Sequence, residues 1–189
     1  MDKKILIGII VVVIVAILGG LFLLGSSDVP LLAGDNSVTL PSDYILDDKG
    51  VAYDGDVGVV FVPVMGGNAS AQKDLFDTLK AKGKDAGYKN VTTDKVNGFK
   101  LYEFVANPDK LQKISSDKVV SGNYETWKEY EPYIPYKDFT DMDVVKYRYV
   151  GYVKGDSIDE LYIFTNNTDV DLYSSEINDI VNSIAVAEK

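Results

Sequence analysis

The sequence of 189 residues contains no cysteine and no histidine. The lack of cysteine excludes disulfides, thiol nucleophiles and thiolate zinc sites. The lack of histidine excludes Ser-His-Asp and Cys-His catalysis, imidazole metal ligands and the usual proton shuttle near neutral pH. Carboxylates, lysines, tyrosines, serines and threonines remain, and these can support glycosidase-type hydrolysis or bind hard cations through oxygen. We expect no cofactor.

Positive charge is also scarce. The chain has 19 Lys and Arg against 29 Asp and Glu, which gives a net charge of −10 and a pI near 4.4. A nucleic-acid partner is disfavoured, because phosphate binding needs a basic face. Docking onto anionic lipid is disfavoured for the same reason. The charge is typical of a soluble acidic surface.

One segment lacks polar side chains altogether. Residues 5–24 read ILIGIIVVVIVAILGGLFLL, and twenty such residues in a helix span about 30 Å, the thickness of a hydrocarbon core. Lys3 and Lys4 precede the segment, so the positive-inside rule places the N-terminus in the cytoplasm. The sequence predicts a signal-anchor in the cell membrane, crossing it once, with everything after residue 25 extracellular.

A cleaved signal peptide is the alternative. Its apolar core is usually about 7–15 residues long and ends at small residues of the A-x-A type. The present segment is longer, and Gly25-Ser26-Ser27 matches that cleavage pattern only weakly. The length favours an uncleaved anchor.

The chain therefore divides into four parts. We expect a cytoplasmic tip at 1–4, a transmembrane anchor at 5–24, a short tether at 25–36 and one extracytoplasmic domain at 37–189.

Hydrophobic patterns in that domain predict strands and two helices. Strands are expected at 37–40 and 57–65, hairpins at 91–105 around Asn97-Gly98 and at 143–165, a short strand at 118–120, and helices at 70–86 and 172–184. Ser70 is the expected N-cap of the first helix, and Gly87 is expected to end it. This order predicts an α+β fold in which an N-terminal transmembrane helix precedes one antiparallel sheet with two main helices packed on it. Pro63 predicts that its strand ends at an edge or bulge.

Three short stretches carry a resemblance. VTLPSDYIL (38–46), VNGFKLYEF (96–104) and EINDIVNSI (176–184) resemble the opening, a hairpin and the closing helix of PsbP/Mog1-like domains. An anchored chain with sequons and no Cys also resembles uncharacterised surface proteins of methanogenic archaea. The resemblance covers residues 36–187 and implies a fold that hosts assembly factors and binding modules more than enzymes. It implies no catalytic residue.

Aromatic residues are concentrated in residues 123–139, NYETWKEYEPYIPYKDF. One interpretation is a cover over the sheet, and the others are a ligand groove and a protein-partner surface. The candidate binding residues are Tyr124, Trp127, Tyr130, Tyr133 and Tyr136.

Acidic side chains suggest two further chemistries. Asn167, Asp169 and Asp171 are spaced like the first half of a calcium loop, although Leu172 and Asn178 stand where that loop needs Gly and Glu. The alternative is that these side chains are solvated and cap the last helix. Three glutamates lie among the aromatic residues: Glu125, Glu129 and Glu131. They suggest a carboxylate-dependent hydrolase, in which two carboxylates must face the bond that is cleaved.

Three Asn-x-Ser/Thr sequons are candidate glycosylation sites, and they begin at Asn68, Asn90 and Asn166. A chance origin in an Asn-rich chain is the alternative. Together the sequence predicts a membrane-anchored, non-enzymatic binding or assembly module with an envelope protein as its partner. A binder of a small ligand, peptide or glycan at 123–139 is the second interpretation, and the hydrolase is the third.

Overall fold

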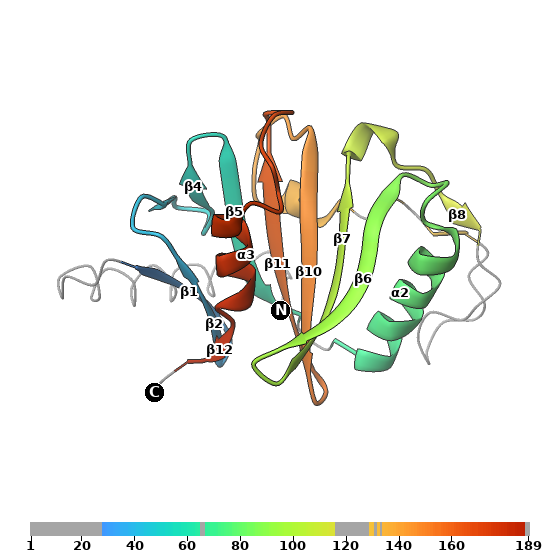
Figure 1. Ribbon diagram of the computed structural model, residues 1–189, viewed down its shortest axis with the longest axis horizontal. Helices are drawn as coiled ribbons and strands as arrows, with labels where there is room; N and C mark the ends of the chain where they lie inside the picture. The colour runs from blue at the N-terminus through green and yellow to red at the C-terminus, as the bar shows by residue number, and fades with distance from the viewer. Residues whose placement is uncertain (1–27, 65–66, 116–128, 131, 133, 188–189) are drawn as a thin grey trace, which may run out of the picture.

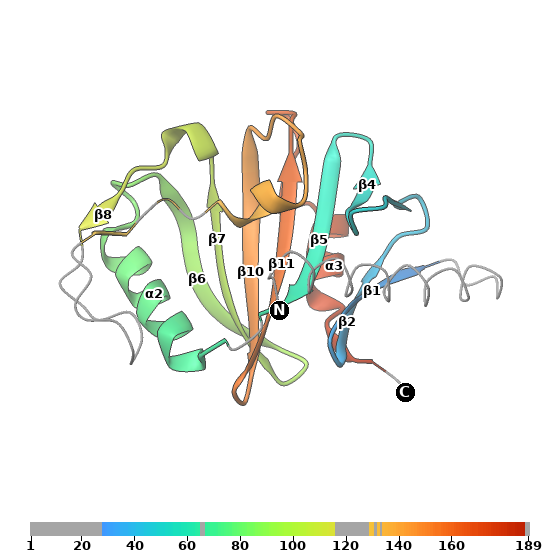
Figure 2. The same cartoon turned by 180° about the vertical axis from the view of Figure 1, so that it is seen from behind.

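The computed structural model describes residues 28–64, 67–115, 129–130, 132 and 134–187. They form two antiparallel sheets, a two-stranded ribbon and two α-helices. Figure 1 shows the larger sheet with the smaller one at one side, and Figure 2 shows it from behind.

The larger sheet has seven strands. Their order is β3 (Ile45–Leu46), β4 (Ala52–Asp54), β5 (Val57–Pro63), β11 (Ser157–Thr165), β10 (Lys146–Lys154), β7 (Phe99–Ala106) and β6 (Tyr88–Val96). The smaller sheet holds β1 (Val29–Ala33), β2 (Asn36–Leu40) and β12 (Ala185–Val186), and the ribbon pairs β8 (Ile114–Ser115) with β9 (Glu129–Tyr130). The helices are α2 (Ala69–Lys82) and α3 (Ser175–Asn182), with 3₁₀ turns η2 (Pro108–Lys110) and η3 (Pro135–Asp138).

Each face of the seven-stranded sheet carries its own hydrophobic core. On one face, α3 and the β1–β2 hairpin cover side chains such as Phe61 and Leu161. The Tyr152 hydroxyl donates to the Val181 carbonyl oxygen at 2.8 Å and fixes α3 to this face. On the other face, α2 and η3 cover the sheet, with Phe76 of α2 among its aromatic rings. The sheet is therefore the middle layer of the domain.

The expected α+β fold with one sheet and two main helices is wrong. Most described residues with regular structure are in strands, and these make two antiparallel sheets beside the short ribbon. The difference arises at residues 29–36, which we expected in the tether. Val29, Leu31 and Ala33 alternate into the core, and the chain turns back at Gly34, whose φ is +61°. The β1–β2 hairpin thus covers part of one face of the larger sheet, beside α3.

The expected fold also opened with a transmembrane helix at 5–24. That segment lies outside the described residues. Within the part of the chain that the structure describes, no helix is both long and apolar enough to cross a membrane.

Both predicted hairpins are confirmed. β6 and β7 turn at Asn97 (φ 49°) and Gly98 (φ 84°), as a type I′ turn requires. β10 and β11 pair along nine residues and turn at Gly155. The short strand expected at 118–120 lies outside the described residues.

The position of Pro63 explains why a proline is tolerated in an interior strand. β4 pairs only with residues 57–59 of β5, so Pro63 lies beyond that pairing. Pro63 pairs with Asp159 of β11 on its other side. The missing N–H therefore falls where β5 has one neighbour among the described strands, as the sequence predicted.

Both helices are shorter than predicted. α2 begins after Asn68, whose Oδ1 accepts from the Ser70 and Ala71 amides at 2.9 and 3.3 Å, so Asn68 rather than Ser70 is the N-cap. It ends at Gly83 rather than Gly87. α3 begins after Ser174, whose Oγ accepts from the Ile177 amide at 3.3 Å.

Candidate functional site

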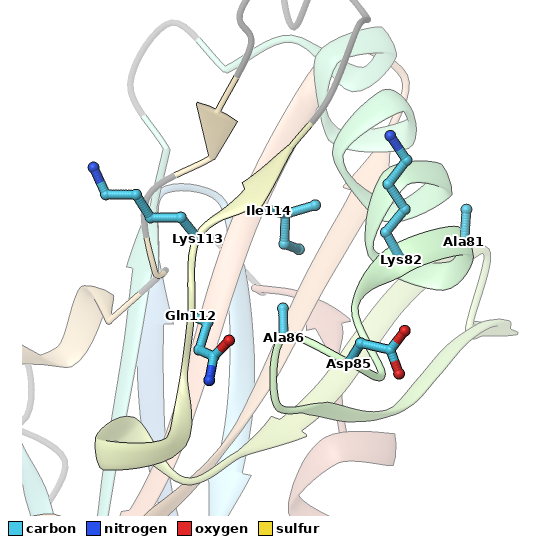
Figure 3. Close-up of a pocket in the computed structure, with 7 residues that line it drawn as sticks. All are labelled: Ala81, Lys82, Asp85, Ala86, Gln112, Lys113 and Ile114. Atoms are coloured by element: carbon cyan, nitrogen blue, oxygen red, sulfur yellow. The ribbon is translucent and has the colours of Figure 1, made fainter.

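A groove lies between the C-terminal end of α2 and the segment that leads into β8. It has a volume of about 460 Å³, within the range of small-molecule sites, and it is open to solvent. Figure 3 shows its lining: Ala81, Lys82, Asp85 and Ala86 on the α2 side, and Gln112, Lys113 and Ile114 on the other.

Short-range backbone contacts hold the two walls together. The Gln112 amide donates to the Ala86 carbonyl oxygen at 2.9 Å, which joins the turn after α2 to the segment before β8. Gly87 has a φ of +98°, and a Cβ there would lie 2.6 Å from the Lys110 carbonyl oxygen. Only glycine permits both this conformation and this approach. The groove is therefore a built feature of the backbone.

The lining is polar and carries both signs of charge. Ile114 is 4% exposed and belongs to the core beneath the groove, while Asp85 and Gln112 are exposed. A carboxylate, an amide and two ammonium groups on one lining suit a partner that forms hydrogen bonds and ion pairs at the rim of an interface.

The groove borders residues 129–130, one part of the aromatic segment 123–139. β8 pairs with β9, so that Ile114 of the groove lies opposite Tyr130 and Ser115 lies opposite Glu129. The chain between these strands includes Tyr124 and Trp127, which lie outside the described residues, as does Tyr133. The backbone pairing brings one end of the predicted binding segment beside the groove.

The last part of the aromatic segment packs on the sheet. Tyr136 is 3% exposed, and its ring centroid lies 5.0 Å from that of Tyr147 and 5.6 Å from that of Phe164. The ring centroid of Phe139 lies 6.2 Å from that of Tyr162. Burial, and then the charges of Asp109 and Asp143, raise the pKa of the Tyr136 hydroxyl. This ring covers the α2 side of the sheet, and its predicted role in binding stays a prediction.

A second polar cluster is buried beneath α2. Glu160 accepts from the Tyr149 hydroxyl at 2.9 Å and from the Tyr162 hydroxyl, and Gln72 of α2 donates to Tyr149 at 2.5 Å. Gly151 lies beside this cluster, since a Cβ there would approach Gln72 Nε2 to 2.6 Å. The cluster fixes α2 to the sheet by specific hydrogen bonds.

A third cluster surrounds Arg148 on the α3 face. Its Nε and Nη2 donate to Glu103 Oε2 at 3.0 and 2.6 Å, and Nη1 donates to the Leu172 carbonyl oxygen and Asn178 Oδ1 at 3.0 and 2.8 Å. The guanidinium carbon lies 4.1 Å from the Tyr173 ring centroid. These contacts hold the loop before α3 against the sheet.

Asp159 and Glu160 do not form a catalytic pair. They are neighbours on β11, so their side chains point to opposite faces of the sheet. Asp159 accepts from Asn36 Nδ2 of β2 at 2.6 Å on the α3 side, while Glu160 lies among the tyrosines on the α2 side. The structure does not describe the side chains of Glu125, Glu129 and Glu131.

The predicted calcium ligands close turns after β11. Asn167 Nδ2 donates to Asp56 at 2.9 Å, its Oδ1 accepts from the Asp169 amide at 2.9 Å, and Asp171 Oδ1 accepts from the Tyr173 amide at 2.9 Å. Among the residues that the structure describes, no group of three acidic side chains is placed to hold one metal ion. Cation binding at these residues stays a prediction.

The sequon residues Asn68, Asn90 and Asn166 are all exposed, at the start of α2, in β6 and after β11.

The sequence did not identify the groove residues. Lys82, Asp85, Gln112 and Lys113 form no motif, and their two walls meet through the Gln112–Ala86 hydrogen bond, which local patterns do not encode. The glycines at 83 and 87 and the Asn107-Pro108 turn were the available signals, because they mark two chain reversals.

No protein-family model matches this chain, and no curated protein matches it. Its function is therefore inferred from its residues and geometry.

Proposed function

We propose that the chain is a non-enzymatic binding or assembly module of the cell envelope. The apolar segment 5–24 holds it at the membrane, and the domain faces the outside. The partner is a neighbouring envelope protein, and it binds at the groove between α2 and β8.

The observation that carries this proposal is the groove beside the β8–β9 ribbon. A backbone-built groove with a charged lining lies next to the predicted aromatic binding segment. Aromatic side chains are enriched in the cores of protein interfaces, and polar side chains lie at their rims. The sequence resemblance to PsbP/Mog1-like domains supports the same class of function.

The engaged state of the buried acids supports a non-enzymatic function. Asp159 and Glu160 each bind a structural partner, and the sequence has no His or Cys to act as a general base or nucleophile.

Affinity capture from solubilised membranes tests the proposal. Gln112→Trp places a large ring in the groove. It leaves intact the hydrogen bond from the backbone N–H of residue 112 to the Ala86 carbonyl oxygen. Lys95→Trp is the matched control, because Lys95 is exposed near the far end of β6. We expect wild type and Lys95→Trp to retain the same partner and Gln112→Trp to lose it.

Thermal melting of all three proteins must give similar midpoints, so that the loss reports binding. Retention of every partner by folded Gln112→Trp would contradict binding at the groove.

The groove volume also favours a second candidate, a small polar ligand bound at the same place. In that case capture yields no protein, and native mass spectrometry of wild type shows a bound small molecule that Gln112→Trp lacks.

A further inference from the structure

Three sequons lie on separate parts of the described surface. Their asparagines are exposed, and the hydroxyl residues Ser70, Thr92 and Thr168 are exposed as well. A transferase must reach both the asparagine amide and the hydroxyl of its motif, so exposure of both is the first structural requirement.

Asn68 caps α2 through its side-chain oxygen. Its Oδ1 accepts from the Ser70 amide at 2.9 Å and from the Ala71 amide at 3.3 Å. These hydrogen bonds use only the oxygen, and glycosylation modifies only Nδ2. A glycan at Asn68 is therefore compatible with its role as N-cap of α2.

Asn166 follows the last residue of β11, in a turn that other residues maintain. Asn167 donates a hydrogen bond to Asp56 and accepts one from the Asp169 amide. The Thr168 carbonyl oxygen accepts from Lys146 Nζ at 2.7 Å. The turn thus has its own hydrogen bonds, and a glycan on Asn166 requires none of them to break.

Asn90 lies at a bulge of β6. The pairing of β6 with β7 shifts between Lys89 and Thr92, and Asn90 has a φ of +51°, which asparagine tolerates better than most residues. β6 pairs with β7 alone among the described strands, so this bulge is at an edge of the sheet. The Thr92 hydroxyl donates to Glu103 Oε1 at 2.9 Å.

We propose that Asn68, Asn90 and Asn166 carry N-linked glycans. In each case Nδ2 attacks the anomeric carbon of a sugar carried on a polyisoprenyl phosphate or diphosphate. The bond from that carbon to the phosphate oxygen breaks, the lipid phosphate leaves, and the amide nitrogen loses one proton as the C–N bond forms. This inference depends on the proposed outward orientation of the domain, where such transfer takes place.

Peptide mass spectrometry of the full chain, purified from membranes of the cells that produce it, tests the inference. We expect glycan masses on the peptides that contain Asn68, Asn90 and Asn166. Ser70→Ala, Thr92→Ala and Thr168→Ala each keep the asparagine and should abolish the glycan at their own site. Ser70→Thr, Thr92→Ser and Thr168→Ser preserve the motifs and should retain it.

Protease added to intact cells separates this inference from the proposed location. Unmodified asparagines on a domain that the protease digests would overturn glycosylation while leaving the location in place. Unmodified asparagines on a protected domain would overturn both. An unmodified peptide at one position overturns the assignment of that site.

Discussion

Arg148 is a charged side chain with four hydrogen bonds, and it is only 3% exposed. Its four hydrogen bonds join β10, β7, the loop before α3 and α3 itself. A buried charge of this kind is costly to leave unpaired, so its ion pair with Glu103 and its four hydrogen bonds are needed to offset the cost of burial.

We expect Arg148→Ala to lower the free energy of unfolding by about 3–5 kcal/mol, because it leaves the Glu103 carboxylate without its cation. Urea denaturation measures the change. Lys146→Ala, on the same strand with one exposed hydrogen bond to Thr168, is the matched control and should cost less than about 1 kcal/mol. Equal losses would show that the Arg148 network contributes nothing special.

Asp159 makes stability depend on pH. Burial chiefly raises the pKa of its carboxyl above 3.8, with the Asn36 hydrogen bond opposing and the charge of Glu160 adding to the rise. The folded state therefore binds the proton more tightly than the unfolded state. The stability contributed by the protonated carboxyl is complete below the unfolded pKa and is lost as pH rises through the folded pKa.

Asp159→Asn keeps an oxygen for Asn36 Nδ2 and removes the buried charge. We expect the variant to be more stable than wild type at pH 7, with the difference shrinking toward pH 3. Urea midpoints at both pH values check this. A variant that is less stable at pH 7 would show that the ionised carboxylate is favourable there.

At the scale of whole elements, the packing of α2 on the sheet depends on a close approach at Gly151. A Cβ at Gly151 would lie 2.6 Å from Gln72 Nε2 and 2.7 Å from the Tyr149 hydroxyl. We expect Gly151→Ala to cost about 1–3 kcal/mol by overpacking, measured by thermal or urea unfolding. Gly155→Asn is the control, since a Cβ at Gly155 meets nothing within 4 Å and asparagine tolerates its φ of +61°. A neutral Gly151→Ala would mean that α2 shifts at no cost.

The segment around η3 is the second cover of that face. We expect Tyr136→Ala to cost about 3–5 kcal/mol, because it opens a cavity over Tyr147 and Phe164. Tyr136→Phe keeps the ring and should cost much less, and the exposed neighbour Lys137→Ala should be nearly neutral. The unfolding midpoints of the three variants measure these costs. A small loss of stability in Tyr136→Ala would show that the ring does not act as a structural cover of the sheet.

Local chemistry made the hairpins predictable, and non-local contacts made the rest unpredictable. Asn97-Gly98 specifies its own turn, whereas the cap at Asn68 was missed because Ser70 is an equally good cap residue by sequence. The β1 strand was missed because its apolar alternation is short and follows the predicted anchor. The pairing of β5 with β11 joins residues about a hundred positions apart, and no local pattern encodes it.

On the scale of the whole molecule, the domain is a central sheet with a core on each face and a polar groove at one end of α2. The two cores explain why the domain needs no disulfide to hold it. The groove is formed by two connections rather than by the sheet, so its exposed lining residues can change in sequence while both cores stay intact.

Site-specific photo-crosslinking in intact membranes tests binding at the groove most directly. A photoreactive residue replaces Gln112 in one protein and Lys95 in a matched control, both at exposed positions. We predict one adduct of defined mass from position 112 and none of that mass from position 95. No adduct from position 112, or the same adducts from both positions, would contradict a partner at the groove.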